Sequence, residues 1–160
     1  MEVVKKVQPP SGPLGLLLRL PVHFYNAGLG WLFGSRMLLI NHVGRVTGKQ
    51  RQVVLELIEH DREKGRYVVA SGWGHKAAWY RNLLHTPDVT IKVGNRSIPV
   101  TAVPMPPEEA VDFMEAYYWR NRHLAKRLLP HLYGYSVDGS RADFREVAEN
   151  VPVMTLVPRA

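Results

Sequence analysis

A short basic turn is the first segment of the sequence whose residue types suit the binding of an anion. Residues 44–51 read GRVTGKQR and place Arg45, Lys49 and Arg51 in one glycine-bracketed connection between two apolar segments. Arginine offers forked N–H donors that suit phosphate and carboxylate groups, and glycine lets a backbone approach a ligand closely. The hydroxyl of Thr47 adds a further donor. The pattern is compatible with an anion site, although charged hairpin turns more often expose their cations to water without a ligand.

A glycine-rich loop followed by aromatic residues is the second such segment. Residues 70–83 read ASGWGHKAAWYRNL, with small residues at the end of an expected strand and Trp73, Trp79 and Tyr80 close behind. Glycines beside aromatic side chains suit a flat ring system that lies against the backbone. Taken alone, an aromatic pair such as Trp79 and Tyr80 on a short helix is more often part of the core.

Composition and spacing argue against several kinds of catalytic site. The chain has no cysteine, which excludes disulfides, thiolate metal sites and thiol nucleophiles. Three residues separate Gly44 from Gly48, whereas a phosphate-binding P-loop needs four, and Gln50 stands where Ser or Thr would hold magnesium. The histidines form no i,i+4 pair and no cluster with carboxylates, so we predict no metal site. No pair of acidic residues is placed for glycosidase-type acid–base chemistry.

The charge of the chain indicates an anionic partner. The net charge is +7 and the isoelectric point is near 9.9, which suits a phosphorylated cofactor, a lipid surface or a nucleic acid. Nucleic acid is the weakest of these, because the aromatic residues cluster with glycines and do not alternate with basic residues along a strand. The apolar stretch at residues 13–34 is interrupted by Arg19, Pro21 and His23, so we expect neither a membrane span nor a secretory signal, and we expect a cytoplasmic protein.

The elements around these segments predict a single α+β domain built on a small antiparallel barrel. We expect a loose arm at residues 1–13, a helical segment at 14–34 that Pro21 divides, a barrel core at 37–104, helices at 107–150 and a last strand at 152–158. About six strands, mostly joined by short hairpins, close most economically as a barrel with peripheral helices. Gly94 and Asn95 mark one hairpin, and Pro107 begins a helix.

Together, the two segments carry a family resemblance. The motifs GRxTGxxR (residues 44–51) and WYxNLxxxP (residues 79–87) occur in order, and the similarity runs from about Leu38 to the C-terminus. The chain resembles the deazaflavin (coenzyme F-420)-dependent nitroreductase and quinone reductase family, whose members have a split β-barrel fold. The resemblance implies an oxidoreductase that transfers a hydride from the reduced deazaflavin to a quinone, a nitro compound or an activated enone.

The resemblance also implies a set of cofactor-binding residues. The basic turn would bind the anionic tail of the coenzyme, the strand after it would run beside the linker and ring, and the glycine loop and following helix would hold the ring. The implied residues are Arg45, Val46, Thr47, Gly48, Lys49, Arg51, Gln52, Val53, Val54, Ala70, Ser71, Gly72, Trp73, Lys76, Ala78, Trp79, Tyr80 and Asn82.

One residue is implied for the acceptor side. Tyr117 corresponds to tyrosines that line the acceptor pocket in relatives, although its helical spacing from Phe113 is equally compatible with a core position. The match departs from the family at Gln50 and Val54, where prolines are usual, and at Gly72, where lysine can occur and Lys76 is the substitute.

Alternatives remain for the cofactor and for the kind of protein. A related split barrel could hold FMN or haem, since a phosphate grip alone does not choose between cofactors. A non-catalytic protein that binds lipid or fatty acid is a second alternative, because residues 16–33 could lie on a membrane surface and make peripheral contact with its inner face. Small barrels of this family often form homodimers, so a homodimer is the alternative to a monomer.

Overall fold

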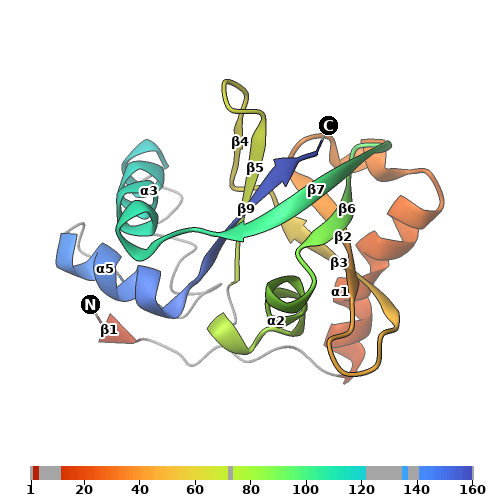
Figure 1. Ribbon diagram of the computed structural model, residues 1–160, viewed down its shortest axis with the longest axis horizontal. Helices are drawn as coiled ribbons and strands as arrows, with labels where there is room; N and C mark the ends of the chain where they lie inside the picture. The colour runs from red at the N-terminus through yellow and green to blue at the C-terminus, as the bar shows by residue number, and fades with distance from the viewer. Residues whose placement is uncertain (1, 4–11, 72–73, 122–134, 137–140, 160) are drawn as a thin grey trace. The chain divides into compact units, whose positions relative to one another are not determined.

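A computed structural model describes residues 2–3, 12–71, 74–121, 135–136 and 141–159 (Figure 1). The chain divides into two compact units, and each is described by itself. The larger comprises Pro10–Val69, Lys76–Pro104 and Met154–Ala160, and the smaller comprises Met1–Pro9, Ala70–His75 and Met105–Val153. The single domain therefore stays a prediction.

The larger unit is built on a curled antiparallel sheet. Its strands are β2 (Met37–Val43), β3 (Gln50–Glu56), β4 (Glu59–Asp61), β5 (Arg66–Ala70), β6 (Asp88–Val93), β7 (Arg96–Pro104) and β9 (Val153–Pro158). Their order across the sheet is β3-β2-β6-β7-β9-β5-β4. The α+β class and the split-barrel type of sheet are confirmed.

The strand count corrects the prediction, since this sheet has seven strands where about six were expected. Residues 51–60 (RQVVLELIEH) alternate apolar and polar side chains in their second half, a pattern that predicts one strand, but the structure divides them into β3 and β4, which lie at opposite edges of the sheet. At the division, the N–H of Leu57 donates to the carbonyl oxygen of Arg36 (2.9 Å), and that of Ile58 donates to Val68 (3.0 Å). The N–H groups of two adjacent residues thus bond to segments near the two opposite edges of the sheet. The sheet must curl to bring these edges together.

The N-terminal helical segment differs from the prediction in where it breaks. Helix α1 (Gly12–Asn26) continues through Pro21, and the short 3-10 helix η1 (Gly30–Phe33) follows. The chain reverses instead at Gly28, whose φ of 76° is easily reached only by glycine. Tyr25 is buried and its ring stacks on Phe33 at 5.4 Å between centroids, which anchors this segment.

Helix α2 (Ala78–His85) packs against β2 and β7. Trp79, Tyr80 and Leu83 are buried within the unit, while the core side chains of the sheet include Leu39, Ile91 and Leu156. The hairpin at Gly94 is confirmed: it joins β6 to β7, and Gly94 has a φ of 59°. This core sets the position of α2 beside the turn that follows β2.

The smaller unit contains α3 (Pro107–Arg120) and α5 (Arg141–Asn150), which pack on each other around Val111, Tyr118 and Phe144. Arg141 donates to Asp112 and Glu115 of α3, each at 2.8 Å. Strand β1 (Glu2–Val3) pairs with β8 (Tyr135–Ser136), and the 3-10 helix η2 (Gly74–Lys76) begins in this unit and ends at the first residue of the other. None of the described helices has the length and apolarity needed to span a membrane.

Candidate functional site

The basic turn connects β2 to β3 as a tight loop closed by its own backbone. The N–H of Gly44 donates to the carbonyl of Lys49 (2.9 Å), and the N–H of Gly48 donates to the carbonyl of Gly44 (2.8 Å). Gly48 has a φ of 69°, which disfavours other residues. A Cβ on Gly44 would lie 2.6 Å from the hydroxyl of Thr47, so the loop leaves no room for a side chain there. The turn therefore favours glycine at both positions: Gly48 because of its backbone conformation, and Gly44 because a Cβ there would displace the Thr47 hydroxyl.

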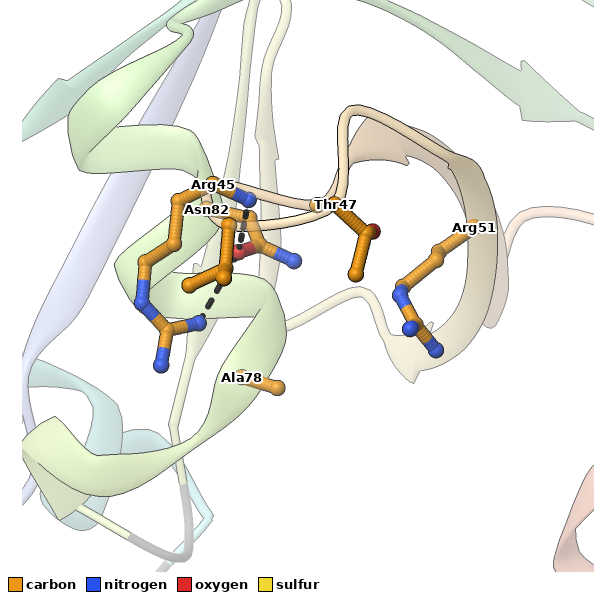
Figure 2. A pocket seen from close by; sticks show the side chains of 7 residues that line it. Arg45, Thr47, Arg51, Ala78 and Asn82 are labelled. Atoms are coloured by element: carbon orange, nitrogen blue, oxygen red, sulfur yellow. Dashed lines mark hydrogen bonds between the residues drawn. The ribbon is translucent and has the colours of Figure 1, made fainter.

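A pocket of about 330 Å³ lies between this turn and the start of α2 (Figure 2). Figure 2 shows the side chains of Arg45 and Arg51 on either side of the space, with Thr47 between them and Ala78 at the helix start. The complete lining is Gly44, Arg45, Val46, Thr47, Arg51, Ala78 and Asn82.

The amide of Asn82 fixes the position of Arg45. Asn82 is buried on α2, and its side-chain oxygen accepts two hydrogen bonds, from the backbone N–H of Arg45 (3.1 Å) and from its guanidinium (3.0 Å). One oxygen thereby holds both the main chain and the side chain of this arginine (Figure 2).

A buried histidine completes this arrangement from behind. His42 on β2 is 4% exposed, and its Nδ1 lies 3.0 Å from the side-chain nitrogen of Asn82. Burial, with a smaller effect from the charge of Arg51, lowers the pKa of His42 from 6.5 to about 4. The histidine is therefore neutral at physiological pH, and the charge of the pocket comes from its arginines.

No carboxylate in the described part of the chain forms an ion pair with the cations of the basic turn, Arg45, Lys49 and Arg51. The N-cap residue of α2, Ala77, makes no side-chain hydrogen bond to the start of the helix, which begins beside the pocket at Ala78. Two guanidinium groups, a hydroxyl and a helix N-terminus with its positive partial charge make a donor set for a phosphate-like anion.

The structure brings together part of the implied set of site residues. Arg45, Val46, Thr47, Arg51, Ala78 and Asn82 line the pocket. Gly48 and Lys49 belong to the basic turn but do not line the pocket. Val53 and Val54 are half-buried on β3. Gln52 hydrogen-bonds to Asn26 and Asn41.

The aromatic residues of α2 have a packing role. Trp79 is 4% exposed and its ring meets that of Tyr80 edge-on at 5.9 Å. The indole N–H of Trp79 has no hydrogen-bond partner among the described residues. Both rings therefore belong to the core that holds α2, which is the more common role that the sequence left open.

The remaining implied residues lie elsewhere in the chain. Ala70 ends β5, and the hydroxyl of Ser71 donates to the carbonyl of Gly74 at 2.6 Å. Lys76 is exposed at the end of η2, while Gly72 and Trp73 lie outside the described residues. Tyr117 belongs to the smaller unit, where its ring stacks on Phe113 at 6.5 Å.

Sequence reasoning missed His42 as a member of the site. Its only signal was a titratable residue within the apolar strand that leads into the turn. The described residues contain no group of three or more His, Asp or Glu side chains that could hold a metal ion, and the lack of a metal site stays a prediction.

Three solved structures illustrate the similarity of the chain to known proteins. One, an F-420-H2 dependent reductase (FDR-A), is 21% identical over 76% of this chain and 93% of its own, with a TM-score of 0.47. A second, a domain-swapped dimer, is 20% identical over 91% of this chain and 99% of its own, with a TM-score of 0.49.

The third supports the fold. It is the conserved hypothetical protein Rv2991 from Mycobacterium tuberculosis, which is 14% identical over 87% of this chain and 80% of its own, with a TM-score of 0.52. No curated protein matches the chain.

The sequence profile of the F-420H(2)-dependent quinone reductases matches residues 18–127, which is most of the chain. This span includes the basic turn, the pocket and α2. The chain belongs to the F-420H(2)-dependent quinone reductase family, so the predicted family, the oxidoreductase class and the deazaflavin coenzyme are confirmed.

Proposed function

We propose that the protein transfers a hydride from reduced coenzyme F-420 to a small organic acceptor, and that the pocket beside the basic turn holds the anionic tail of the coenzyme. The observation that supports this proposal is the pair of guanidinium groups, from Arg45 and Arg51, at a pocket where no described carboxylate forms an ion pair with either.

The residues of the pocket fit a phosphodiester. Arg45 and Arg51 present forked donors, Thr47 presents a hydroxyl, and the start of α2 presents backbone N–H groups beside the small side chain of Ala78. A volume of about 330 Å³ accommodates only part of so long a molecule. The tail would bind here and the ring beyond it, beside Val53 and Val54 of β3.

The chain's contribution to the reaction is positioning. The bound coenzyme would supply a hydride, so no side chain has to form a covalent bond. Holding the coenzyme by its tail lowers the entropic cost of bringing its ring to the acceptor. Quinones, nitro compounds and activated enones are the acceptor classes that we propose, with Tyr117 on the acceptor side.

A titration tests the tail site directly. The fluorescence of oxidised F-420 should report its binding. We expect Arg45→Ala or Arg51→Ala to weaken the affinity roughly ten- to hundredfold, the effect of losing one charge-assisted hydrogen bond. Arg81→Ala, at an exposed arginine of the same α2, is the charge-matched control. Affinity within twofold of wild type in the double variant at 45 and 51 would refute the tail site.

Single-turnover oxidation tests the acceptor. Protein loaded with reduced coenzyme is mixed with menadione or with a nitroaromatic compound, and the rate of reoxidation is measured. If one compound speeds reoxidation of the coenzyme, the acceptor is assigned to the class of that compound. If neither compound does so, quinones and nitro compounds are both refuted as acceptors. Binding of FMN or haem in preference to F-420 in the same titration would favour the alternative cofactors.

Peripheral contact with a membrane is a second proposal, supported by exposed apolar side chains in the N-terminal segment. The segment 20–32, spanning α1 and η1, exposes Leu20, Phe24, Leu29, Trp31 and Leu32, with Trp31 60% exposed. Large apolar residues on a basic protein suit the interface of an anionic bilayer. We propose that the protein is cytoplasmic and that this segment contacts the inner face of the membrane.

Vesicle sedimentation tests the membrane proposal. Wild type should sediment with vesicles that contain phosphatidylglycerol, and the Trp31→Ala, Leu32→Ala double variant should lose this property. Trp119→Ala, at a tryptophan that is 50% exposed on α3, is the control. Equal sedimentation of the double variant and wild type would exclude this segment as the contact.

Self-association is a proposal supported by similarity alone. One similar structure is a domain-swapped dimer. We propose a homodimer, and sedimentation velocity across a range of protein concentrations distinguishes it from a monomer.

A further inference from the structure

His42 lies behind the pocket and does not line it. It belongs to β2, where its backbone is the register partner of Arg51 on β3. Its ring faces Asn82 of α2, since the ring nitrogen Nδ1 and the amide nitrogen are 3.0 Å apart. One buried histidine therefore links the strand that supports Arg51 to the helix that holds Arg45.

The hydrogen bonds around Asn82 determine which way its amide is oriented. An amide nitrogen only donates and an amide oxygen only accepts. Both bonds from Arg45 come from N–H groups, so the oxygen of Asn82 must face Arg45. The nitrogen then faces His42, and the reversed amide would place its N–H groups against those of Arg45.

This orientation requires one tautomer of the histidine. Because the nitrogen of Asn82 donates to Nδ1 of His42, Nδ1 carries no proton, and the neutral ring is protonated at Nε2. A proton on Nδ1 would oppose the amide N–H and favour the reversed amide, which repels Arg45.

We propose that His42 is a positioning residue of the anion pocket: its unprotonated Nδ1 orients the amide of Asn82, whose oxygen holds Arg45 at the pocket. The proposal rests on the assignment of this pocket to the coenzyme tail. A guanidinium that is already held loses less conformational freedom when it binds an anion. His42 thus contributes to affinity for the tail without touching it.

Two substitutions separate this role from simple core packing. His42→Leu keeps an apolar side chain of similar bulk and removes the acceptor, whereas His42→Asn keeps an acceptor oxygen near the position of Nδ1. We expect His42→Leu to weaken binding of F-420 roughly tenfold, the size of one lost hydrogen bond, and His42→Asn to restore most of the affinity. His85→Leu, at an exposed histidine of α2, is the control.

The probes are chosen to locate the loss at the tail. Binding of the full coenzyme is compared with binding of the ring-and-ribityl fragment, which lacks the phosphodiester. Weaker binding of the full coenzyme alone supports the proposal, and an equal loss for both molecules contradicts it. If Arg45→Ala and Arg51→Ala leave binding of the full coenzyme unchanged, the tail site itself is wrong.

Nitrogen-15 NMR of the wild-type protein tests the role of His42 without any ligand. At about pH 7 the ring of His42 should be neutral, because its pKa of about 4 lies well below this pH. We expect Nδ1 to be unprotonated and Nε2 to be protonated, because the amide of Asn82 donates to Nδ1. We also expect Asn82→Leu to shift the Arg45 guanidinium signal and to increase its exchange with water. A protonated Nδ1 in the wild type would overturn the proposal, and this result is independent of how well any variant folds. An Arg45 guanidinium signal that stays unchanged in His42→Leu would also overturn it.

Discussion

Asn26 and Gln52 form a reciprocal pair of amide hydrogen bonds, at 2.8 Å and 3.0 Å, that joins the end of α1 to β3. The nitrogen of Gln52 also donates to the side-chain oxygen of Asn41 on β2, at 2.8 Å. The N-terminal helix is thus tied to the strand that follows the basic turn, although 26 residues separate the two partners in the sequence.

We predict that Gln52→Ala loosens α1 from the sheet. Each of these exposed side-chain hydrogen bonds contributes on the order of 1 kcal/mol, so the substitution should lower the free energy of unfolding by about 1–2 kcal/mol. Hydrogen exchange should become faster in α1 before it does so in β6. Gln50→Ala, at an exposed glutamine of the same strand, is the control, and equal exchange in the two variants would contradict the prediction.

We predict that a side chain at Gly44 is tolerated better once Thr47 is shortened. The added Cβ of Gly44→Ala would lie 2.6 Å from the Thr47 hydroxyl, which must move and open the turn. Gly44→Ala should cost about 1–3 kcal/mol in urea unfolding, and noticeably less in a Thr47→Ala background. Additive effects in the double variant would show that the clash lies elsewhere.

We predict that Arg45→Lys binds F-420 more weakly than wild type although the charge is kept. Lysine lacks the planar fork, so it cannot bond to the oxygen of Asn82 and present further donors to an anion in the same geometry. The loss should be roughly tenfold in Kd, as for one charge-assisted hydrogen bond. Equal affinity in the coenzyme titration would mean that Arg45 acts only through its charge.

We predict a stability change in mild acid that depends on His42. The folded chain keeps this histidine neutral down to about pH 4, while the unfolded chain protonates it near pH 6.5. Unfolding therefore takes up a proton in this window, and the free energy of unfolding falls as the pH is lowered from 6.5 to 4. The contribution is complete above pH 6.5 and amounts to at most on the order of 3 kcal/mol.

Urea unfolding at a series of pH values measures this effect. His42→Asn should flatten the slope between about pH 4 and 6.5, while His85→Asn should not. An identical slope in wild type and His42→Asn would assign the acid sensitivity to other groups.

The sequence by itself determined the family and the α+β class, and it predicted the residues of the anion site that we propose. Local patterns carry this information, because a glycine-bracketed basic turn and a paired motif on the next helix depend on neighbours in the chain. Arg45, Thr47 and Asn82 could therefore be named before their arrangement was seen.

Only the tertiary structure decided how those residues work together. The segment 51–60 looks like one strand, and it divides because Leu57 and Ile58 bond to opposite sides of a curled sheet. The amide of Asn82 meets Arg45 from 37 residues away, and His42 lies behind it 40 residues away. Burial and hydrogen-bond direction arise from packing distant segments together, so no local pattern could reveal the role of this histidine.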